Sequence, residues 1–272
     1  MNQLVGERLS IINAKAQTTR HRILGIVNKP DYQIVFSDTP GIIEPKYELQ
    51  KSMMKFVNTA FADADVILLV VDVNDSVEGN SEVIKRLKTV EIPIIVVINK
   101  IDLSEQSRLN ELAEKWLNEL PKARIIPISA LRKANIKQLE ESITSFLPEA
   151  PPYYPKDELT DRPERFFVSE IIREKILTYY KKEVPYSVEV EIESFKEKPE
   201  ITDIRALIYV NRESQKGIII GKGGLALKKV GTAARVDIEK FLDKKVFLEL
   251  YVKVKKNWRE DANQLKRFGY QE

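Results

Sequence analysis

At positions 94–102 the chain reads Ile94-Ile95-Val96-Val97-Ile98-Asn99-Lys100-Ile101-Asp102, an unbroken β-branched run that ends in a polar tetrapeptide. Such a run is typical of a strand that is covered on both faces of a parallel sheet. Similar runs occur at 33–36, 66–73 and 125–128, and amphipathic segments of helical length lie at 81–90, 104–120 and 135–147. This alternation predicts a doubly wound α/β domain.

The second half of the chain has a different pattern. A proline-rich segment at 148–155 predicts an extended linker, so we expect domains at 1–148 and 157–272 joined by residues 149–156. After the linker we expect an α+β domain whose sheet has one solvated face. Its expected elements are a helix at 170–180, alternating strands at 187–194 and 203–211, a long helix and a strand at 246–254. In the first half, 23–27 and 33–36 flank a turn sequence and predict an antiparallel hairpin.

Composition and charge narrow the class of protein. The chain has 43% hydrophobic and 31% charged residues and no cysteine, which excludes disulfides and thiolate metal sites. It contains neither an apolar run of about 18 residues nor a signal-peptide pattern, so we expect a cytosolic protein, at most bound to a membrane from outside. Residues 212–259 carry 13 basic and 5 acidic residues, which fits either a polyanionic partner or a solvated surface.

The tetrapeptide at 99–102 follows a strand, and the carboxyl ends of parallel strands are where open sheets bind ligands. The Asp102 carboxylate can accept two hydrogen bonds from guanine, whereas adenine would leave the charge unpaired. Asn99 can hold the segment and the base edge, and the stem of Lys100 can cover the ring. Taken alone, the tetrapeptide also fits an ordinary turn after a strand.

Ser129-Ala130-Leu131 follows the run at 125–128 in the same way. The Ala130 amide can donate to the guanine carbonyl, and Ser129 also fits a helix N-cap.

Asp38-Thr39-Pro40-Gly41 follows the run at 33–36. Asp38 can hold Mg²⁺ through a water, and Gly41 lets the backbone approach a terminal phosphate, although a Pro-Gly turn would look the same. Asp38 precedes Asn99 by 61 residues, and Asp102 precedes Ser129 by 27. Three segments in this order at strand ends jointly indicate a guanine-nucleotide site.

The three segments resemble the third, fourth and fifth motifs of the translation-factor-related GTPases, and residues 17–22 are similar to switch I of the Era family. The resemblance implies a P-loop-NTPase-like GTPase that uses GTP, GDP and Mg²⁺, with Asp38 and a switch I threonine at the ion. Thr19 is the first choice for this threonine and Thr18 the second. The GTP-binding residues would be Asp38, Thr39, Pro40, Gly41, Ile42, Asn99, Lys100, Ile101, Asp102, Ser129, Ala130 and Leu131.

No catalytic residue is assigned. Ile42 stands where many small GTPases carry the glutamine that orients the attacking water, and Era-like proteins also have a hydrophobic residue there, so slow intrinsic hydrolysis is expected. The only histidine, His21, is expected to be an exposed loop residue rather than a general base.

The family begins with a strand and a Gly-x-x-x-x-Gly-Lys-Ser phosphate loop, and this loop does not occur in the sequence. Residues 1–7 resemble the part of the first helix that follows it. Either the start was misassigned or the chain truncated, or the protein is a degenerate variant; the intact guanine and Mg²⁺ motifs favour the first reading. We expect severely reduced GTP affinity and an unstable first domain. Micromolar binding of GTP or GDP in a calorimetric titration would contradict this.

Residues 218–224 resemble the Ile-Gly-x-x-Gly signature of KH domains, whose loop joins two short helices and clamps about four nucleotides of single-stranded RNA. The order of strands around the loop is that of the type II arrangement. A dinucleotide fingerprint at Gly221-x-Gly223-x-x-Ala226, with Glu239 as the ribose acid, is rejected because the strand at 246–254 alternates with charged residues. The expected RNA-binding residues are Lys216, Gly221, Lys222, Gly223, Gly224, Lys228 and Arg235. Tyr251, Phe247 and Trp258 could stack on bases, with core packing the default for Phe247.

The resemblance covers residues 1–272. It implies a GTP-controlled monomer that binds the 3′ end of 16S rRNA, assists 30S subunit assembly and associates peripherally with the inner membrane. GTP would order switch I around Mg²⁺ and shift the relation between the domains. The alternative is a non-enzymatic KH-type RNA-binding protein whose first domain is a dead scaffold. An in-frame Gly-x-x-x-x-Gly-Lys-Ser upstream of Met1 would decide between them.

Overall fold

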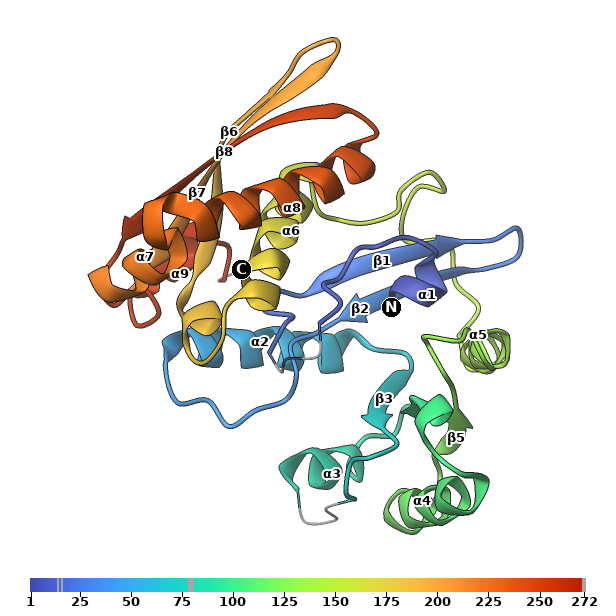
Figure 1. Cartoon of the computed structure of the whole chain (residues 1–272). Helices are drawn as coiled ribbons and strands as arrows, with labels where there is room; N and C mark the ends of the chain where they lie inside the picture. Colours follow the sequence, from blue (N-terminus) through green and yellow to red (C-terminus); the bar gives the residue numbers. More distant parts are fainter. Residues whose placement is uncertain (14, 16, 78–80, 271–272) are drawn as a thin grey trace. The chain divides into compact units, whose positions relative to one another are not determined.

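The computed structural model describes residues 1–13, 15, 17–77 and 81–270, which form two compact units (Figure 1). The first unit comprises Met1–Glu7, Gly25–Phe36 and Asn58–Leu159. The second comprises Arg8–Leu24, Ser37–Val57 and Thr160–Glu272. The expected linker at 149–156 lies in the first unit, and the division into domains at 148 and 157 stays a prediction.

The first unit is built on a parallel sheet. Its strands, in the order β3-β4-β5, are Ile67–Asp72, Ile94–Asn99 and Arg124–Pro127. Ile95, Val96, Val97 and Ile98 in the central strand are at most 1% exposed. One face packs against α3 (Glu82–Leu87) and α4 (Gln106–Glu119), and the other against α5 (Ile136–Thr144) and the β1–β2 hairpin. The predicted doubly wound α/β arrangement is confirmed.

The hairpin consists of β1 (Ile23–Asn28) and β2 (Gln33–Asp38), which form a sheet of their own. The Lys29 amide donates to the Tyr32 carbonyl at 2.9 Å and closes the turn, as predicted. Among the described residues, β3 pairs only with β4, and Val70 on β3 is 61% exposed. The first unit therefore has a free, apolar sheet edge.

Two α-helices were not among the expected elements. The longer is α2 (Glu48–Asp63). Its pattern was present in the sequence, because Leu49, Met53, Phe56, Val57 and Ala60 recur at helical spacing, and these residues are buried. The other is α9 (Ala262–Arg267), near the end of the chain, whereas α1 (Asn2–Val5) lies within residues 1–7, where a helix was expected. A short 3-10 helix, η1, covers Ile101–Leu103.

The second unit is the predicted α+β fold. Its three-stranded sheet has the order β6-β7-β8, with β6 (Glu189–Glu197) antiparallel and β8 (Lys245–Val254) parallel to β7 (Ile201–Val210). One face is covered by α6 (Glu164–Tyr179), α7 (Glu213–Ile220) and α8 (Leu225–Leu242) (Figure 1). Between this face and the helices lies a core made mainly of valine and isoleucine side chains. Two 3-10 turns, η2 (Val184–Ser187) and η3 (Lys222–Gly224), complete the unit.

The other face of this sheet is solvated only in part. The exposed Arg205 and the half-buried Glu249 lie on it and pair at 3.0 Å, as a solvated face predicts. Tyr209, however, is 6% exposed because the Phe268 ring lies 5.3 Å away. A small second core joins the start of α2 to the C-terminal segment; its buried members are Leu49, Met53, Phe56, Trp258, Leu265 and Tyr270.

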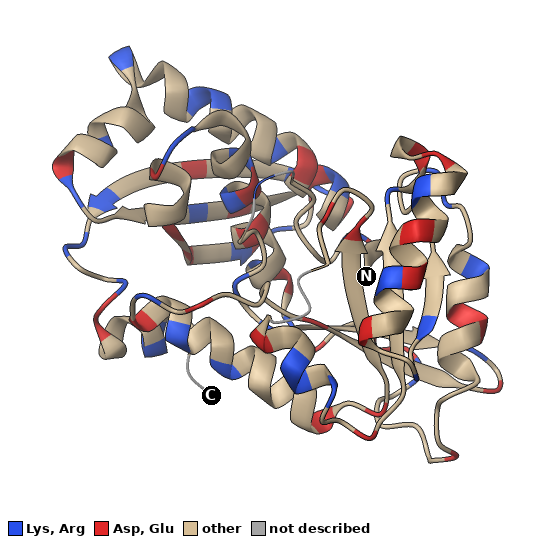
Figure 2. Cartoon of the chain, turned by 90° about the horizontal axis from the view of Figure 1, so that it is seen from below, with Lys and Arg blue, Asp and Glu red and all other residues tan. Residues whose placement is uncertain are grey.

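Charges of both signs are spread over both units (Figure 2). Within the described part of the chain, none of the helices combines the length and the apolar character that crossing a bilayer requires.

Candidate nucleotide and RNA sites

The segments predicted to recognise guanine meet at the carboxyl ends of β4 and β5, where Ile98 pairs with Pro127. The Asn99 side-chain oxygen accepts hydrogen bonds from the amides of Lys100 (2.8 Å) and Ala130 (3.0 Å) and so bridges the two loops. The hydroxyl of Ser129, which is 1% exposed, donates to Asp102 Oδ1 at 2.5 Å. The loops are thus held together by the residues that the sequence singled out.

Two properties of this edge suit a planar base. Asp102 is exposed and its second carboxylate oxygen, Oδ2, is left for a ligand, while Leu103 and Leu131 are 63% and 78% exposed. The Ala130 amide, expected to donate to the guanine carbonyl, points to Asn99 in this structure. Ser129 also accepts from the Arg132 amide at 3.0 Å and so closes a turn, but the expected helix N-cap is wrong, because Asn135 holds the N-cap position of α5.

Lys100 is held by a residue that sequence reasoning missed. Its backbone is left-handed (φ 65°), and its ammonium lies 2.6 Å from Asp72 Oδ2 at the end of β3. This contact raises the pKa of Lys100 and lowers the pKa of Asp72. Asp72 is paired in register with Asn99, at the same edge of the sheet. The sequence feature that could have identified it is its position as a polar residue within the apolar run at 66–73.

The Mg²⁺ motif lies in the second unit. Asp38, at the end of β2, accepts a hydrogen bond from the Ser10 hydroxyl at 2.6 Å, and burial raises the pKa of its carboxyl group. Among the described residues, no lysine or arginine pairs with Asp38, and no cluster of three His, Cys, Asp or Glu could hold a metal by itself. A half-buried carboxylate without a lysine or arginine partner fits Mg²⁺, which binds one or two carboxylates together with phosphates and waters.

The neighbours of Asp38 differ in exposure. Pro40 is buried and Thr39 half-buried, whereas Gly41 and Ile42 are exposed. A Cβ atom at Gly41 would meet nothing within 4 Å, and its φ is not in the left-handed region. Packing therefore gives no reason for glycine at this position, in keeping with the approach of a ligand to its backbone.

Residues 17–22, predicted to be switch I, are held by buried groups of the second unit. Arg20 is 3% exposed and donates to the carbonyls of Val188 (2.7 Å) and Tyr186 (3.1 Å) and to Glu189 (3.2 Å). Arg173 on α6 donates to the Thr18 carbonyl at 2.5 Å. Thr19 lies half-buried between these anchors.

The expectation that His21 is exposed is wrong. It is 6% exposed, stacks on the Tyr270 ring at 4.2 Å, and contacts the Phe268 carbonyl through Nε2 at 3.2 Å. Burial lowers the pKa of His21 to about 4. The C-terminal segment that covers it lies almost 250 residues away in the sequence, so no local pattern could have shown this.

The glycine-rich loop has the backbone that its sequence predicts. Gly221 ends α7 with φ 71° and ψ 177°, and a Cβ atom there would lie 2.6 Å from the Ala226 side chain. Gly223 and Gly224 also have positive φ angles, 58° and 78°. Lys222 is exposed at the tip. The loop is therefore closed to side chains at its base and cationic at its end.

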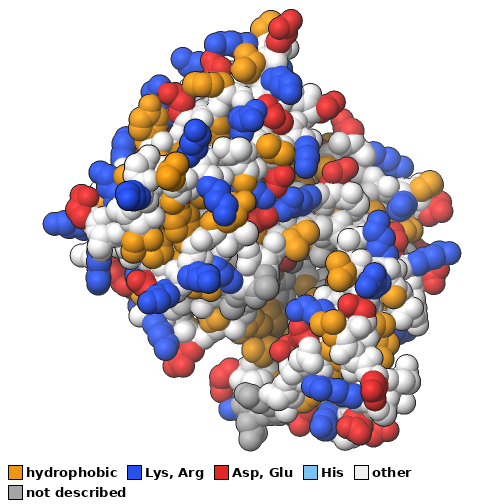
Figure 3. Space-filling view, viewed as in Figure 1, with side chains coloured by type: hydrophobic (Ala, Val, Ile, Leu, Met, Phe, Trp, Pro, Cys, Tyr) orange, Lys and Arg blue, Asp and Glu red, His pale blue; other side chains and the backbone are white. Residues whose placement is uncertain are grey.

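A groove of about 380 Å³ runs from this loop between α8 and β8. Three of the seven predicted RNA-binding residues line it, namely Gly224, Lys228 and Arg235; the other four, Lys216, Gly221, Lys222 and Gly223, do not. The sequence missed the residues that form its floor: Leu227, Gly231, Thr232, Leu248 and Leu250. The sequence did contain one sign of this floor, the glycine at position 231 inside a long helix. A Cβ atom there would lie 3.3 Å from Leu250, so glycine allows α8 and β8 to approach each other closely. The face seen in Figure 3 carries lysine and arginine side chains with hydrophobic ones between them.

The aromatic residues in and after the last strand differ from expectation in which of them are buried. Phe247, predicted to be a core residue, is 53% exposed, because the helices cover only the face that Leu248 and Leu250 occupy. Tyr251 is 45% exposed on the same side. Trp258 is fully buried and donates to the Ser187 carbonyl at 3.1 Å, so it belongs to the core.

Comparisons with known proteins show which families the two parts of the chain resemble. Residues 1–100 match the family described as 50S ribosome-binding GTPase, and residues 183–259 match the KH domain family. GTPase Era of Alkaliphilus metalliredigens (strain QYMF) is 47% identical, with 100% of this chain and 93% of that protein aligned. The chloroplastic GTPase ERA1 of Zea mays is 46% identical over 99% of this chain and 66% of that protein.

Two solved structures cover 100% of this chain and 93% of their own, each at 40% identity and a TM-score of 0.95. One is Era in complex with MgGDPNP and nucleotides 1506–1542 of 16S ribosomal RNA. The other is a variant of Aquifex aeolicus Era bound to GDP·AlF₄⁻.

Proposed function

Because the chain belongs to the Era family of GTPases, we propose that it binds GTP and GDP with Mg²⁺, hydrolyses GTP, and binds the 3′ end of 16S rRNA during assembly of the 30S subunit. The observation that carries the proposal is that one chain holds a guanine-type loop pair at the ends of β4 and β5 and a groove beside a Gly-x-x-Gly loop.

Guanine selection rests on Asp102. Its exposed carboxylate is an acceptor for the two N–H donors of guanine, and the Ser129 hydroxyl fixes its orientation. Adenine offers no such pair of donors, so the charge would lose its partners. Leu131 and the Lys100 stem supply apolar surface for the ring.

In this proposal, residues of the second unit bind Mg²⁺ and the phosphates of the nucleotide. Asp38 would hold Mg²⁺, with Thr19 as the switch I ligand, and the ion would neutralise charge that develops on the phosphates. The exposed backbone at Gly41 can donate to a terminal phosphate. The side chain of Ile42 is 44% exposed and cannot hydrogen-bond a water, so we expect a slow intrinsic rate of hydrolysis.

RNA binding falls to the groove. Lys228 and Arg235 attract the backbone electrostatically, the loop lets phosphates approach, and the leucine floor takes the base faces. The proposal also includes a cytoplasmic, monomeric protein that associates peripherally with the inner membrane.

The base site is tested by saturation-transfer NMR with GDP and ADP, which detects binding up to millimolar dissociation constants. We expect a signal for GDP but not for ADP, and loss of the GDP signal in Asp102→Asn. Glu105→Gln, an exposed carboxyl change nearby, is the control and should leave it intact. Equal signals for both nucleotides would refute guanine selection.

The groove is tested by fluorescence anisotropy with a single-stranded RNA of the 16S 3′-end sequence. Replacing Lys222 and Gly223 by Asp should weaken binding at least tenfold, because negative charge enters the phosphate track. RNA binding without any GDP signal would favour the non-enzymatic KH protein instead.

A further inference from the structure

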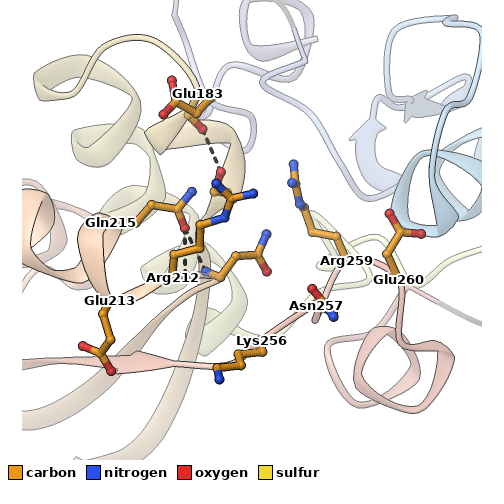
Figure 4. Close-up of a pocket in the computed structure, with 10 residues that line it drawn as sticks. Glu183, Arg212, Glu213, Gln215, Lys256, Asn257, Arg259 and Glu260 are labelled. Atoms are coloured by element: carbon orange, nitrogen blue, oxygen red, sulfur yellow. Dashed lines mark hydrogen bonds between the residues drawn. The ribbon is translucent and has the colours of Figure 1, made fainter.

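A cavity of about 480 Å³ in the second unit is not used by the proposed function (Figure 4). It lies at the N-terminal end of α7, against η2 and the loop that follows β8. The groove lies beyond the other end of α7, and the two cavities have no lining residue in common.

The cavity contains arginines without carboxylate partners. Figure 4 shows the guanidinium groups of Arg212 and Arg259 directed into the same space. The carboxylates of Glu183 and Glu213 are turned outward, and that of Glu260 accepts a backbone amide at 3.4 Å. Among the residues that the structure describes, no ion pair involves either arginine. Two planar guanidinium forks facing one space are suited to a phosphate group.

Uncharged polar groups beside the arginines suit a ligand that carries a hydrogen-bond donor next to its phosphate. Asn211 Oδ1 is buried and has no hydrogen-bond donor in the structure. The Gln215 side chain accepts from the amides of Asn211 (3.0 Å) and Arg212 (3.1 Å) and so fixes the turn that presents both. A hydroxyl or amine next to the phosphate, such as a ribose 2′-hydroxyl, would satisfy Asn211.

We propose that this cavity, the arginine pocket, binds a backbone phosphate of the same single-stranded RNA that lies in the groove. The inference rests on the proposed RNA-binding function. The two sites are connected by α7, whose N-cap is Arg212 and whose C-cap is Gly221. Eight helical residues span about 12 Å, which a stacked strand covers with on the order of four nucleotides. An RNA that extends past the loop reaches both sites.

The pocket also contacts residues 47–49, at the start of α2. The Arg259 carbonyl accepts from the Leu49 amide at 3.0 Å, and its guanidinium lies 4.8 Å from the Tyr47 ring centre. Occupation of the pocket would therefore hold residues 47–49 through Arg259.

The experiment compares RNA lengths. A four-nucleotide RNA fills the groove alone, and two twelve-nucleotide RNAs extend it on the 5′ or the 3′ side. Arg212→Gln combined with Arg259→Gln should weaken one of the twelve-mers about tenfold and reduce its salt slope by about one. The four-mer should bind unchanged, which also shows that the KH fold is intact. Arg165→Gln with Lys196→Gln, an equal charge change at exposed positions, is the control and should have little effect.

Arg212→Lys keeps the charge and loses the fork, so it should give an intermediate loss if phosphate geometry matters. Titration with inorganic phosphate, followed through the arginine Nε–Hε NMR signals, separates the possible sources. Signals that shift while both twelve-mers ignore the double variant would show a small phosphorylated ligand and overturn the RNA assignment. No response to either probe would overturn the pocket itself. If the unaltered protein fails to bind even the four-mer, the proposed RNA-binding function fails first.

Discussion

Polar side chains have opposite environments in the two units. In the first, Asp102 and Lys100 stand at exposed strand ends, where Asp102 accepts from Ser129 and Lys100 pairs with Asp72. In the second, the side chains of Arg20 and Glu189 are 4% and 7% exposed, and those of Arg173 and Glu170 are 1% and 9% exposed. Exposed groups are available to a ligand, whereas the buried ones are taken up by the fold.

This difference changes how residues 17–22 are understood. Their sequence resembles a nucleotide switch, yet Arg20 and His21 are packed as core residues of the unit that holds the KH fold. Any rearrangement of this segment must remove buried charges from their partners, which is energetically expensive. The segment is therefore expected to move as a whole or not at all.

The largest expected effect comes from breaking the buried pair. Arg20→Ala removes the ion-pair partner of the Glu189 carboxylate, which keeps the hydrogen bond that the Tyr270 hydroxyl donates at 2.6 Å, and should destabilise the second unit by about 3–5 kcal/mol. The two tryptophans lie in different units, Trp116 in the first and Trp258 in the second. Urea unfolding followed by tryptophan fluorescence in a Trp116→Phe background therefore reports the second unit alone.

Arg205→Ala is the matched control. Its pair with Glu249 is 46% and 34% exposed, so the loss should be much smaller than that of Arg20→Ala. Equal losses in the two variants would show that burial does not distinguish these ion pairs.

The second prediction concerns the loop. Gly221→Ala places a methyl group 2.6 Å from Ala226 and forces a backbone conformation that only glycine adopts readily, at a cost of about 2–4 kcal/mol. Gly217→Ala, in the same helix, meets nothing within 4 Å and should stabilise the unit slightly, because alanine favours helix. Urea unfolding in the Trp116→Phe background measures both. A Gly221 variant as stable as the Gly217 variant would contradict the loop geometry.

The sequence predicted well what depends on neighbouring residues. The strand-end segments were found because an apolar run and a polar tetrapeptide are adjacent, and the loop because its glycines form a pattern within seven residues. The hairpin turn was local as well.

What depends on distant packing was not predicted. Arg20 lies 169 positions from Glu189, so its burial leaves no local trace. The alternation in β8 shows that two faces differ but not which one the helices cover, and Phe247 was accordingly placed on the wrong face. The leucine floor of the groove depends in the same way on how α8 meets β8.

The third prediction uses pH. His21 has a pKa of about 4 in the folded chain against 6.5 ordinarily, so between these values the unfolded chain binds the proton more readily. Stability of the second unit should therefore fall as the pH drops below 6.5, by about 2 kcal/mol at pH 5.

His21→Phe, which keeps a ring between Tyr270 and Phe166, should remove this loss. Burial raises the pKa of Glu189, which acts in the opposite direction, so the difference between the two proteins isolates the histidine. Parallel pH profiles of unfolding free energy would show that His21 does not titrate in this window.

The smallest effect is expected at the exposed pair of the first unit. Asp72→Asn removes the partner of Lys100, but the side chains are 24% and 54% exposed, so the unit should lose no more than about 1 kcal/mol. Urea unfolding in a Trp258→Phe background measures it, and 1 M salt should erase most of the difference by screening (a Debye length of about 3 Å). A salt-insensitive loss as large as that of Arg20→Ala would mean that the Asp72–Lys100 pair at the strand ends is part of the core, as the Arg20–Glu189 pair is. It would then not be an exposed surface that a base can contact.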